Sequence, residues 1–266
     1  MPIAAPFRVK RCALLLLALA AQTPPALAGP PYLTDDPEPV ELGHWEIYGF
    51  STGTWVRGDS AGALPAIDVN YGAAPDLQAH AAAAIAFNRQ PGTGAQFGYG
   101  DSEIGAKYRF IRADPDDWWP QVAVYPHLFA PTGATARGLG TGRTHGFVPV
   151  WAQKELGDWT TYGGAGYGIN PGEGNKNYWF VGWVLQRRVA ADLAAGLELF
   201  HQTASSTSGP GSVGFPLGTT DTTGFNLGLT YDWTQHDHLL LSMGRGIQNA
   251  STSNRFSYYA AYQWTY

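Results

Sequence analysis

The sequence predicts an all-β protein: a transmembrane up-and-down antiparallel β-barrel of about 12 strands, with short periplasmic turns and longer extracellular loops. Three observations predict it. The chain begins like an exported protein, most of the remainder alternates apolar and polar residues with a period of two, and its connections alternate between short and long. A period of two gives each strand one apolar face, and alternating connection lengths are typical of outer-membrane barrels.

Residues 1–28 have the composition of a cleaved secretory signal peptide. Three basic residues precede an apolar run over 12–21, and small residues follow up to Ala28. An apolar run of about ten residues is too short for a transmembrane anchor, so we expect export and cleavage after Ala28. The only cysteine, Cys12, would leave with this segment, which excludes a disulfide, a thiolate metal site and a catalytic cysteine in the mature chain.

The composition excludes several classes of protein. Charged residues make up 14 % of the chain, against about 25 % in average proteins, and glycine (34 residues) and aromatic residues (14 %) take their place. No apolar stretch after the signal peptide reaches the roughly 18 residues of a membrane helix. The net charge is −5 and the basic residues are scattered, so no nucleic-acid partner is expected.

Twelve segments alternate with a period of two and have the length of a tilted membrane strand. In the third, for example, Leu77 and His80 fall on opposite faces. The fifth and sixth are the weakest, because Pro126 and Pro149 each remove a backbone hydrogen-bond donor. The predicted strands are 44–56, 64–72, 77–88, 98–111, 119–130, 145–154, 159–169, 177–187, 192–202, 222–233, 238–248 and 255–266.

The connections supply an independent regularity. Every other connection is short and has Asp just before the next strand, as in AAPD (73–76) and ELGD (155–158). The connections between them are longer and rich in Gly, Ser, Thr or Asn. With an even number of strands both termini fall on the short-turn side, and aromatic residues beside these turns, such as Trp159 and Trp233, would form an interfacial girdle.

The last strand carries aromatic residues at alternate positions up to the final residue. Tyr262, Trp264 and Tyr266 share one face with Phe256 and Tyr258. An aromatic face on water would promote aggregation, so we expect lipid to cover this face and the last strand to close the sheet. We interpret Tyr262, Trp264 and Tyr266 as the assembly signal read by the outer-membrane insertion machinery.

The mature chain is expected to have two parts. Residues 29–42 are Pro-rich and lack strand alternation, which favours a periplasmic lead or a partial plug, and residues 43–266 would form the barrel. Glycines at 163–168, together with Gly182 and Gly196, are expected to let the sheet close or bulky rings pack. Their alternative role is to clear a path for a solute.

Three stretches resemble a known family. GPPYLTDDPEPVELGHWEIY, GYGDSEIGAKYRFI and HLFAPTGATARGLGTGRTHGFVPVWAQKELGDWTTYGGAGYGINP are similar to the outer-membrane barrels of the MetA-pathway of phenol degradation family. The likeness covers nearly the whole mature chain. It implies an outer-membrane barrel linked to the uptake of aromatic compounds, and it assigns no binding residues.

Polar residues between the apolar ones would face the lumen, since a Lys or Arg at mid-depth on the lipid face costs roughly 2–4 kcal/mol. The predicted pore-lining residues are Asp68, Asn70, His80, Asp101, Glu103, Lys107, Arg109 and Glu198. Their alternative role is to pair across strands and fill the barrel. About twelve strands lie between the filled interior of eight and the aqueous channel of sixteen, so we expect a narrow or partly plugged pore.

No catalytic residue is predicted. An outer-membrane phospholipase needs a Ser two residues after a His, and none of the seven histidines has one. Asp237 and His238 fall in a predicted periplasmic turn, the wrong end for an outer-membrane protease, and His236 and His238 offer at most two metal ligands. Asp35 and Asp36 are interpreted as a turn rather than as a carboxylate pair. No cofactor and no metal is therefore expected.

Together these observations predict a channel or transporter for small solutes, with hydrophobic or aromatic compounds as candidates, in the outer membrane of a diderm bacterium. The alternatives are a structural or surface-binding barrel with a blocked lumen and, third, an outer-membrane hydrolase. The expected partners are outer-membrane lipid and lipopolysaccharide, the outer-membrane assembly machinery and a small-molecule solute.

Overall fold

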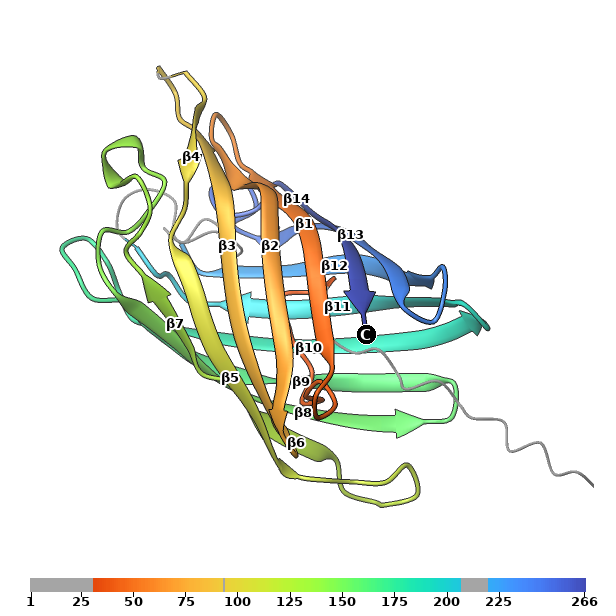
Figure 1. Ribbon diagram of the computed structural model, residues 1–266. Coiled ribbons are helices and arrows are strands. Elements are labelled where there is room, and N and C mark those ends of the chain that lie inside the picture. The colour runs from red at the N-terminus through yellow and green to blue at the C-terminus, as the bar shows by residue number, and fades with distance from the viewer. Residues whose placement is uncertain (1–30, 93, 207–219) are drawn as a thin grey trace, which may run out of the picture.

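One antiparallel sheet closes into a barrel in the computed structural model (Figure 1), which describes residues 31–92, 94–206 and 220–266. The predicted signal peptide, residues 1–28, lies outside the described residues. The pairing of the first strand with the last closes the sheet, as predicted. No helix that could span a membrane occurs among the described residues. The elements are β1 Trp45–Trp55, β2 Ser60–Ala74, β3 Leu77–Arg89, β4 Gln96–Tyr99, β5 Ser102–Ile111, β6 Gln121–Val124, β7 His127–Ala130, η1 Thr135–Arg137, β8 His145–Leu156, β9 Trp159–Ile169, β10 Tyr178–Ala190, β11 Leu193–Gln202, β12 Thr222–Asp232, β13 Asp237–Gln248 and β14 Phe256–Thr265.

The 14 strands found among the described residues occupy the 12 positions in the barrel wall that the sequence predicts. β4 and β5 both pair with β3, and β6 and β7 both pair with β5 and β8, so each of these two pairs is one interrupted strand. The second interruption falls at Tyr125 and Pro126. The carbonyl of Pro149 on β8 accepts a hydrogen bond from the N–H of Tyr125 (3.1 Å). The nitrogen of Pro149 faces the same neighbouring strand as its carbonyl, so the hydrogen-bond donor that Pro149 lacks is lacking at this interruption. The two prolines therefore share one break in the ladder.

The strand bounds agree closely with those expected from the alternation. β9 begins at Trp159 and ends at Ile169, the range predicted. β2 is longer than predicted, because a bulge between Ala63 and Ala66 accommodates Pro65 and lets the strand begin at Ser60.

The barrel is apolar outside and polar inside. On β5, Ile104 is 56 % exposed and Tyr108 is 50 % exposed, whereas Lys107 is 4 % exposed. A soluble protein has the opposite distribution, and an outer-membrane barrel has this one. β14 follows the same rule, since Tyr262 and Trp264 are exposed and Gln263 between them is buried.

The two rims of the barrel differ. We call the rim beside the last residue, Tyr266, the turn end, and the opposite rim the loop end. The turn end carries the connections 75–76, 112–120, 157–158, 191–192 and 233–236, and the loop end carries 56–59, 90–95, 131–144, 170–177, 203–221 and 249–255. The lengths overlap, because 56–59 is short and 112–120 is long, but the tightest turns and the longest loop lie at the expected rims. Residues 207–219 of that longest loop are outside the described part.

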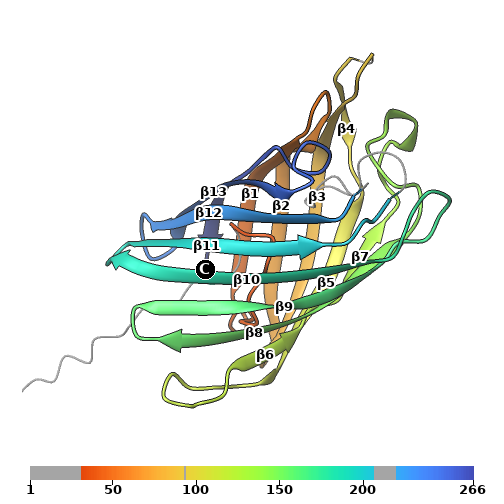
Figure 2. The same cartoon turned by 180° about the vertical axis from the view of Figure 1, so that it is seen from behind.

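Residues 31–42, which we call the N-terminal segment, lie inside the barrel, as the red trace beside β9 and β10 shows (Figure 2). The segment enters at the turn end, where Leu42 forms a parallel bridge with Gly72 of β2. At its other end the Ser242 hydroxyl of β13 donates a hydrogen bond to the carbonyl of Pro31 (2.6 Å). The segment therefore runs from the rim to the middle of the wall.

Glycines in the wall make room for this segment. A Cβ on Gly182 of β10 would lie 1.8 Å from Thr34 Oγ1, and a Cβ on Gly196 of β11 would lie 2.6 Å from the hydroxyl of Tyr32. These two glycines accommodate the N-terminal segment, and a Cβ on Gly182 would also lie 2.9 Å from the Phe180 ring, which agrees with the expected role in ring packing. Gly168 of β9 likewise serves ring packing, since a Cβ there would lie 2.1 Å from a tyrosine ring.

Candidate functional site

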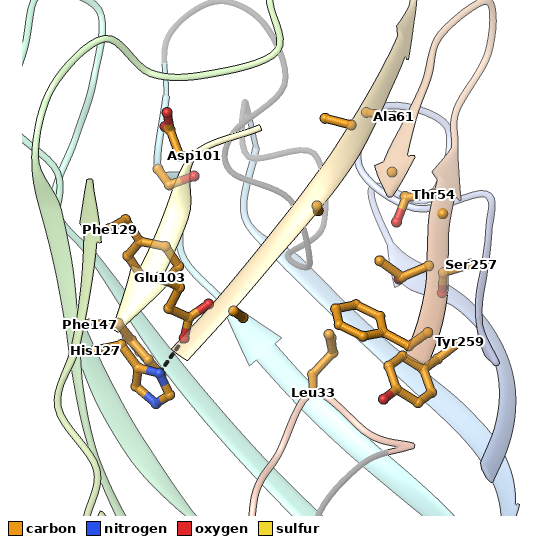
Figure 3. A pocket seen from close by; sticks show the side chains of 18 of the residues that line it. Leu33, Thr54, Ala61, Asp101, Glu103, His127, Phe129, Phe147, Ser257 and Tyr259 are labelled. Atoms are coloured by element: carbon orange, nitrogen blue, oxygen red, sulfur yellow. Dashed lines mark hydrogen bonds and ion pairs between the residues drawn. The ribbon is translucent and has the colours of Figure 1, made fainter. Parts of the chain in front are cut away.

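The lumen contains a cavity of about 450 Å³ between the N-terminal segment and the loop end. Leu33 of the segment points into it from one side, and residues of the loops such as Leu139 and Asn254 line the other. Figure 3 shows two kinds of side chain facing this space, the carboxylates of Asp101 and Glu103 and a group of aromatic rings. The cavity is therefore polar on one part of its surface and apolar on another.

The apolar part, which we call the aromatic wall, is a cluster on the strands from β6 to β11. It comprises Tyr125, Phe129, Phe147, Trp151, Tyr178, Phe180 and Phe200. The rings of Phe180 and Phe200 stack with their centroids 6.3 Å apart, and Trp151 meets Phe180 edge to face. Each such pair contributes about 0.5–1.5 kcal/mol beyond burial. The interior of a transmembrane barrel is ordinarily polar, so this cluster of rings is an unusual apolar surface inside the lumen.

The polar part, which we call the polar wall, centres on His80 of β3. His80 Nδ1 lies 3.0 Å from Asp68 Oδ1, and its Nε2 lies 3.2 Å from Glu103 Oε1. The same Glu103 oxygen lies 2.5 Å from Nδ1 of His127 (Figure 3). Asn70 joins through its side-chain oxygen, 3.1 Å from His80 Nδ1. His80, Glu103 and His127 also have the spacing of a metal site, with ligand atoms within 4.8 Å of one another.

Lys107 of β5 joins the polar wall to the N-terminal segment. Its Nζ lies 3.2 Å from Asp35 Oδ1 and 3.6 Å from Asp36 Oδ1. Burial raises the pKa of Asp36, whereas at Asp35 the ammonium group of Lys107 outweighs burial and lowers the pKa. The turn expected here is present, because Asp36 Oδ1 accepts the N–H of Glu38 (2.6 Å). Both carboxylates also face one ammonium group, so they act together in binding Lys107, a pairing that the sequence interpretation set aside in favour of the turn.

Glu198 of β11 holds the same segment by hydrogen bonds. Its carboxylate accepts the backbone N–H of Thr34 (2.6 Å), the Thr34 hydroxyl (2.7 Å) and the backbone N–H of Leu33 (3.2 Å). Asn226 donates a further bond at 2.6 Å. The Glu198 side chain is fully buried. A buried carboxylate needs such donors, so Glu198 lies inside the barrel but is covered by the segment.

Two predicted residues lie near the rims. Asp101 accepts the backbone N–H groups of Gly133 (2.9 Å) and Thr141 (2.8 Å) and so anchors the loop between β7 and β8. Arg109 forms an ion pair with Asp76 at the turn end (3.0 Å), which Arg112 shares. Burial alone would raise the pKa of Asp76, but the hydrogen bonds from Arg112 and Arg109 outweigh it and lower the pKa.

The eight predicted lumen residues all lie on the inner side of the barrel, in different surroundings. Asp68, Asn70, His80 and Glu103 lie together in one network. Lys107 and Glu198 instead contact the N-terminal segment. Asp68, Asp101 and Glu103 line the cavity. Sequence reasoning missed His127 and the aromatic wall. Its one available signal was the phase of alternation in β8, where Phe147 and Trp151 are buried between exposed valines.

The barrel resembles solved outer-membrane structures. The COG4313 outer membrane channel from Pseudomonas putida F1 matches with a TM-score of 0.61 and 16 % identity, over 87 % of this chain and 98 % of that chain. The KdgM porin matches with a TM-score of 0.54 and 10 % identity, over 83 % and 99 %. The NanC porin matches with a TM-score of 0.51 and 9 % identity, over 83 % and 98 %. These likenesses establish the fold.

No match is found among curated protein sequences. The family model described as "Putative MetA-pathway of phenol degradation" matches residues 46–265, which is nearly the whole barrel. The match confirms the resemblance noted in the sequence. The chain therefore belongs to the MetA-pathway of phenol degradation family.

Proposed function

We propose that the protein is an outer-membrane channel for small solutes whose lumen is partly plugged by the N-terminal segment. The inverted distribution of residues, apolar outside and polar inside, supports a membrane location. The similar solved structures are described as an outer membrane channel and as porins. Export through a cleaved signal peptide and recognition of Tyr262, Trp264 and Tyr266 by the assembly machinery belong to this proposal.

The aromatic wall carries the proposal for the solute. Phe129, Phe147, Trp151 and Tyr178 all line the cavity, and Glu103 and His127 line it beside them. An aromatic surface binds ring faces by stacking, and a neighbouring carboxylate and imidazole bind polar substituents. We therefore propose small solutes that carry an aromatic ring and a polar group, and no catalytic step.

The N-terminal segment is proposed as the constriction. It is held along its length by Lys107 through Asp35 and Asp36, by Glu198 through Thr34, by Ser242 through Pro31, and by Gln78, which accepts the N–H of Val40. A short segment fixed mainly by side chains of the wall detaches more readily than a strand of the sheet, because its backbone bridge to the wall is confined to Leu42 and Gly72 at the turn end. Detachment would connect the cavity with the turn end.

Planar-bilayer recording tests the proposal. The mature protein should show small conductance, and deletion of 31–42 should raise it severalfold. A small neutral phenol added to the loop side should block the current, whereas a sugar of similar size should not. Protein that migrates as a folded barrel but stays electrically silent after the deletion would contradict the channel.

A structural barrel with a blocked lumen is the second candidate. The full burial of Glu198 and Thr34 favours it, because both side chains close part of the lumen. Under this alternative, deletion of 31–42 would lower thermal stability in detergent and produce no current. The two candidates are therefore separated by the same recordings.

A further inference from the structure

We propose that His80, Glu103 and His127 form a binding site for a divalent transition-metal cation, for which Zn²⁺ is the probe. The ligand atoms of these three side chains lie within 4.8 Å of one another. Two imidazoles and one carboxylate form a common zinc-binding set, and imidazole also suits copper, iron and nickel. The proposal concerns binding alone and does not depend on transport.

Register across three neighbouring strands creates the site. His80 on β3 is opposite Gly105 on β5, and Gly105 is opposite His127 on β7, so the two histidines flank a glycine in one row. The glycine leaves space between them, and the two imidazole rings approach to 5.6 Å between centroids at 74°. Glu103 lies two residues from Gly105 on the same inner face and completes a triangle.

A side chain at position 105 would disturb this arrangement. A Cβ there would lie 2.9 Å from the carbonyl oxygen of Pro126 and 3.4 Å from the His80 ring. All three ligands stand on strands of the barrel rather than on loops. Strands hold ligand positions more closely than loops do, which favours a preformed site.

The surroundings of His80 match those of a metal ligand. Its Nδ1 faces Asp68 Oδ1 at 3.0 Å and Asn70 Oδ1 at 3.1 Å, so Nδ1 carries a proton and donates it. A ligating histidine ordinarily donates its second N–H to a carboxylate in this way. Asp68 is therefore a positioning residue, which fixes the tautomer that directs Nε2 towards Glu103.

The Nε2 atom of His80 supplies the second observation. It is buried and makes no hydrogen bond, although Glu103 Oε1 is only 3.2 Å away. A ring lone pair facing a carboxylate oxygen is unfavourable unless a proton or a cation lies between them. The side chains of His80 and Glu103 are thus set up to share a proton, or a metal cation in its place.

Geometry also allows a further ligand. Glu103 and His127 line the cavity, whereas His80 lies behind them in the wall. Three protein ligands leave a position of a tetrahedral ion open, and here that position faces the cavity, where water or a solute oxygen can bind. The 2.5 Å contact between Glu103 and His127 must lengthen to admit the ion, which requires rotation of the Glu103 carboxylate.

Equilibrium dialysis of the chelator-treated, refolded mature barrel against Zn²⁺, followed by elemental analysis, tests the proposal. We expect one zinc ion per barrel. His80→Gln and His127→Gln should each abolish binding at the same zinc concentration, and Asp68→Asn should weaken it about 10- to 100-fold. Substitution by Co²⁺ should give the visible absorption of a tetrahedral N/O site, with an altered spectrum in Asp68→Asn.

His145→Gln is the matched control, because His145 lines the same cavity but lies outside the group of three. It should bind zinc like the wild type. Heat-dependent migration in gels identifies variants that fold, and the partly exposed His127 remains informative if His80→Gln does not fold. Wild-type barrel that binds no zinc, or folded His127→Gln that binds it with unchanged affinity, would overturn the proposal.

Discussion

The polar wall and the aromatic wall are built from neighbouring strands, yet they are held together differently. In the polar wall each charged group has a specific partner, as Glu103 has His80 and His127, and the adjoining Lys107 has Asp35 and Asp36 of the N-terminal segment. In the aromatic wall the rings are held by packing against one another. A buried charge without its partner is far more costly than a ring with one contact fewer. The polar wall therefore binds the N-terminal segment, and the aromatic wall offers a surface that a solute can share.

The largest expected effect follows the loss of Lys107. Lys107→Ala leaves Asp35 and Asp36 buried without their cation, and breaking a buried ion pair costs about 3–5 kcal/mol. We expect the N-terminal segment to undock and the single-channel conductance to rise towards that of the 31–42 deletion. Lys154→Ala, which removes an ammonium group outside the lumen, should leave the conductance unchanged. An unaltered current in Lys107→Ala would break the contrast between the walls.

An aromatic truncation should weaken the barrel without releasing the segment. Phe147 stacks on Tyr178 with ring centroids 6.1 Å apart and lines the cavity. Phe147→Ala should lower the free energy of unfolding by about 3 kcal/mol and reduce block by a small neutral phenol. The outward-facing Val148→Ala is the control. Block that stays at the wild-type level in Phe147→Ala would remove the aromatic wall from the proposed solute site.

Substitution of two carboxylates should distinguish ion selectivity, which we assign to Glu103, from anchoring of the N-terminal segment, which we assign to Glu198. Glu103 lines the cavity, so Glu103→Gln in chelator-treated buffer should lower the weak cation preference expected of acidic groups in a narrow pore. Glu198 is buried under the segment, and Glu198→Gln replaces charge-assisted hydrogen bonds by neutral ones, at about 1–2 kcal/mol. It should raise the frequency of opening and leave selectivity unchanged. Reversal potentials and open probabilities measure the two effects, and equal shifts in both variants would contradict the assignment.

The smallest expected effect is a dependence on pH. Burial raises the pKa of Glu38 in the N-terminal segment to about 6, with Arg109 and Lys107 acting against this and Glu155 and Glu46 adding to it. Docked Glu38 thus binds a proton more tightly than Glu38 of the detached segment, so its contribution to docking is full below about pH 4.5 and is lost as the pH rises to about 6. The change in opening should be on the order of tenfold.

Glu38→Gln tests this pH dependence directly. The variant keeps the shape of the side chain and removes its titration. Open probability between pH 4.5 and 7 should then lose the part of its slope that Glu38 contributes, while Asp36, whose pKa burial also raises, leaves a slope of the same sign. A slope equal to that of the wild type would assign the pH dependence to another group.

Most of the fold follows from the sequence because a barrel wall depends on local alternation. The outward apolar series of β5 and β14 and the twelve wall positions are visible without any knowledge of contacts. The break at Pro126 and the bulge at Pro65 are harder to predict from the sequence, because the effect of a proline depends on which neighbouring strand loses a hydrogen-bond donor.

Much less of the site follows from the sequence, for two physical reasons. Alternation carries no contrast where both faces are apolar, as in Tyr178–Leu185 of β10, so the inner rings were not recognised. Contacts between distant residues, such as Lys107 with Asp35 or Glu198 with Thr34, depend on the path of the N-terminal segment. The spacing of residues along the chain does not predict that path.

The plug is tested most directly by enlarging a residue in the wall behind it. Gly182→Val would place its Cβ 1.8 Å from Thr34 Oγ1 and 3.0 Å from Thr34 Cβ, which displaces the segment from Glu198. Gly49→Val, at an outward position where a Cβ meets no atom within 4 Å, is the control. If the segment constricts the lumen, single-channel recording should show a higher conductance in Gly182→Val than in the wild type and in Gly49→Val, although a side chain has been added inside the barrel. A conductance in folded Gly182→Val that is equal to or lower than that of the wild type would contradict the account.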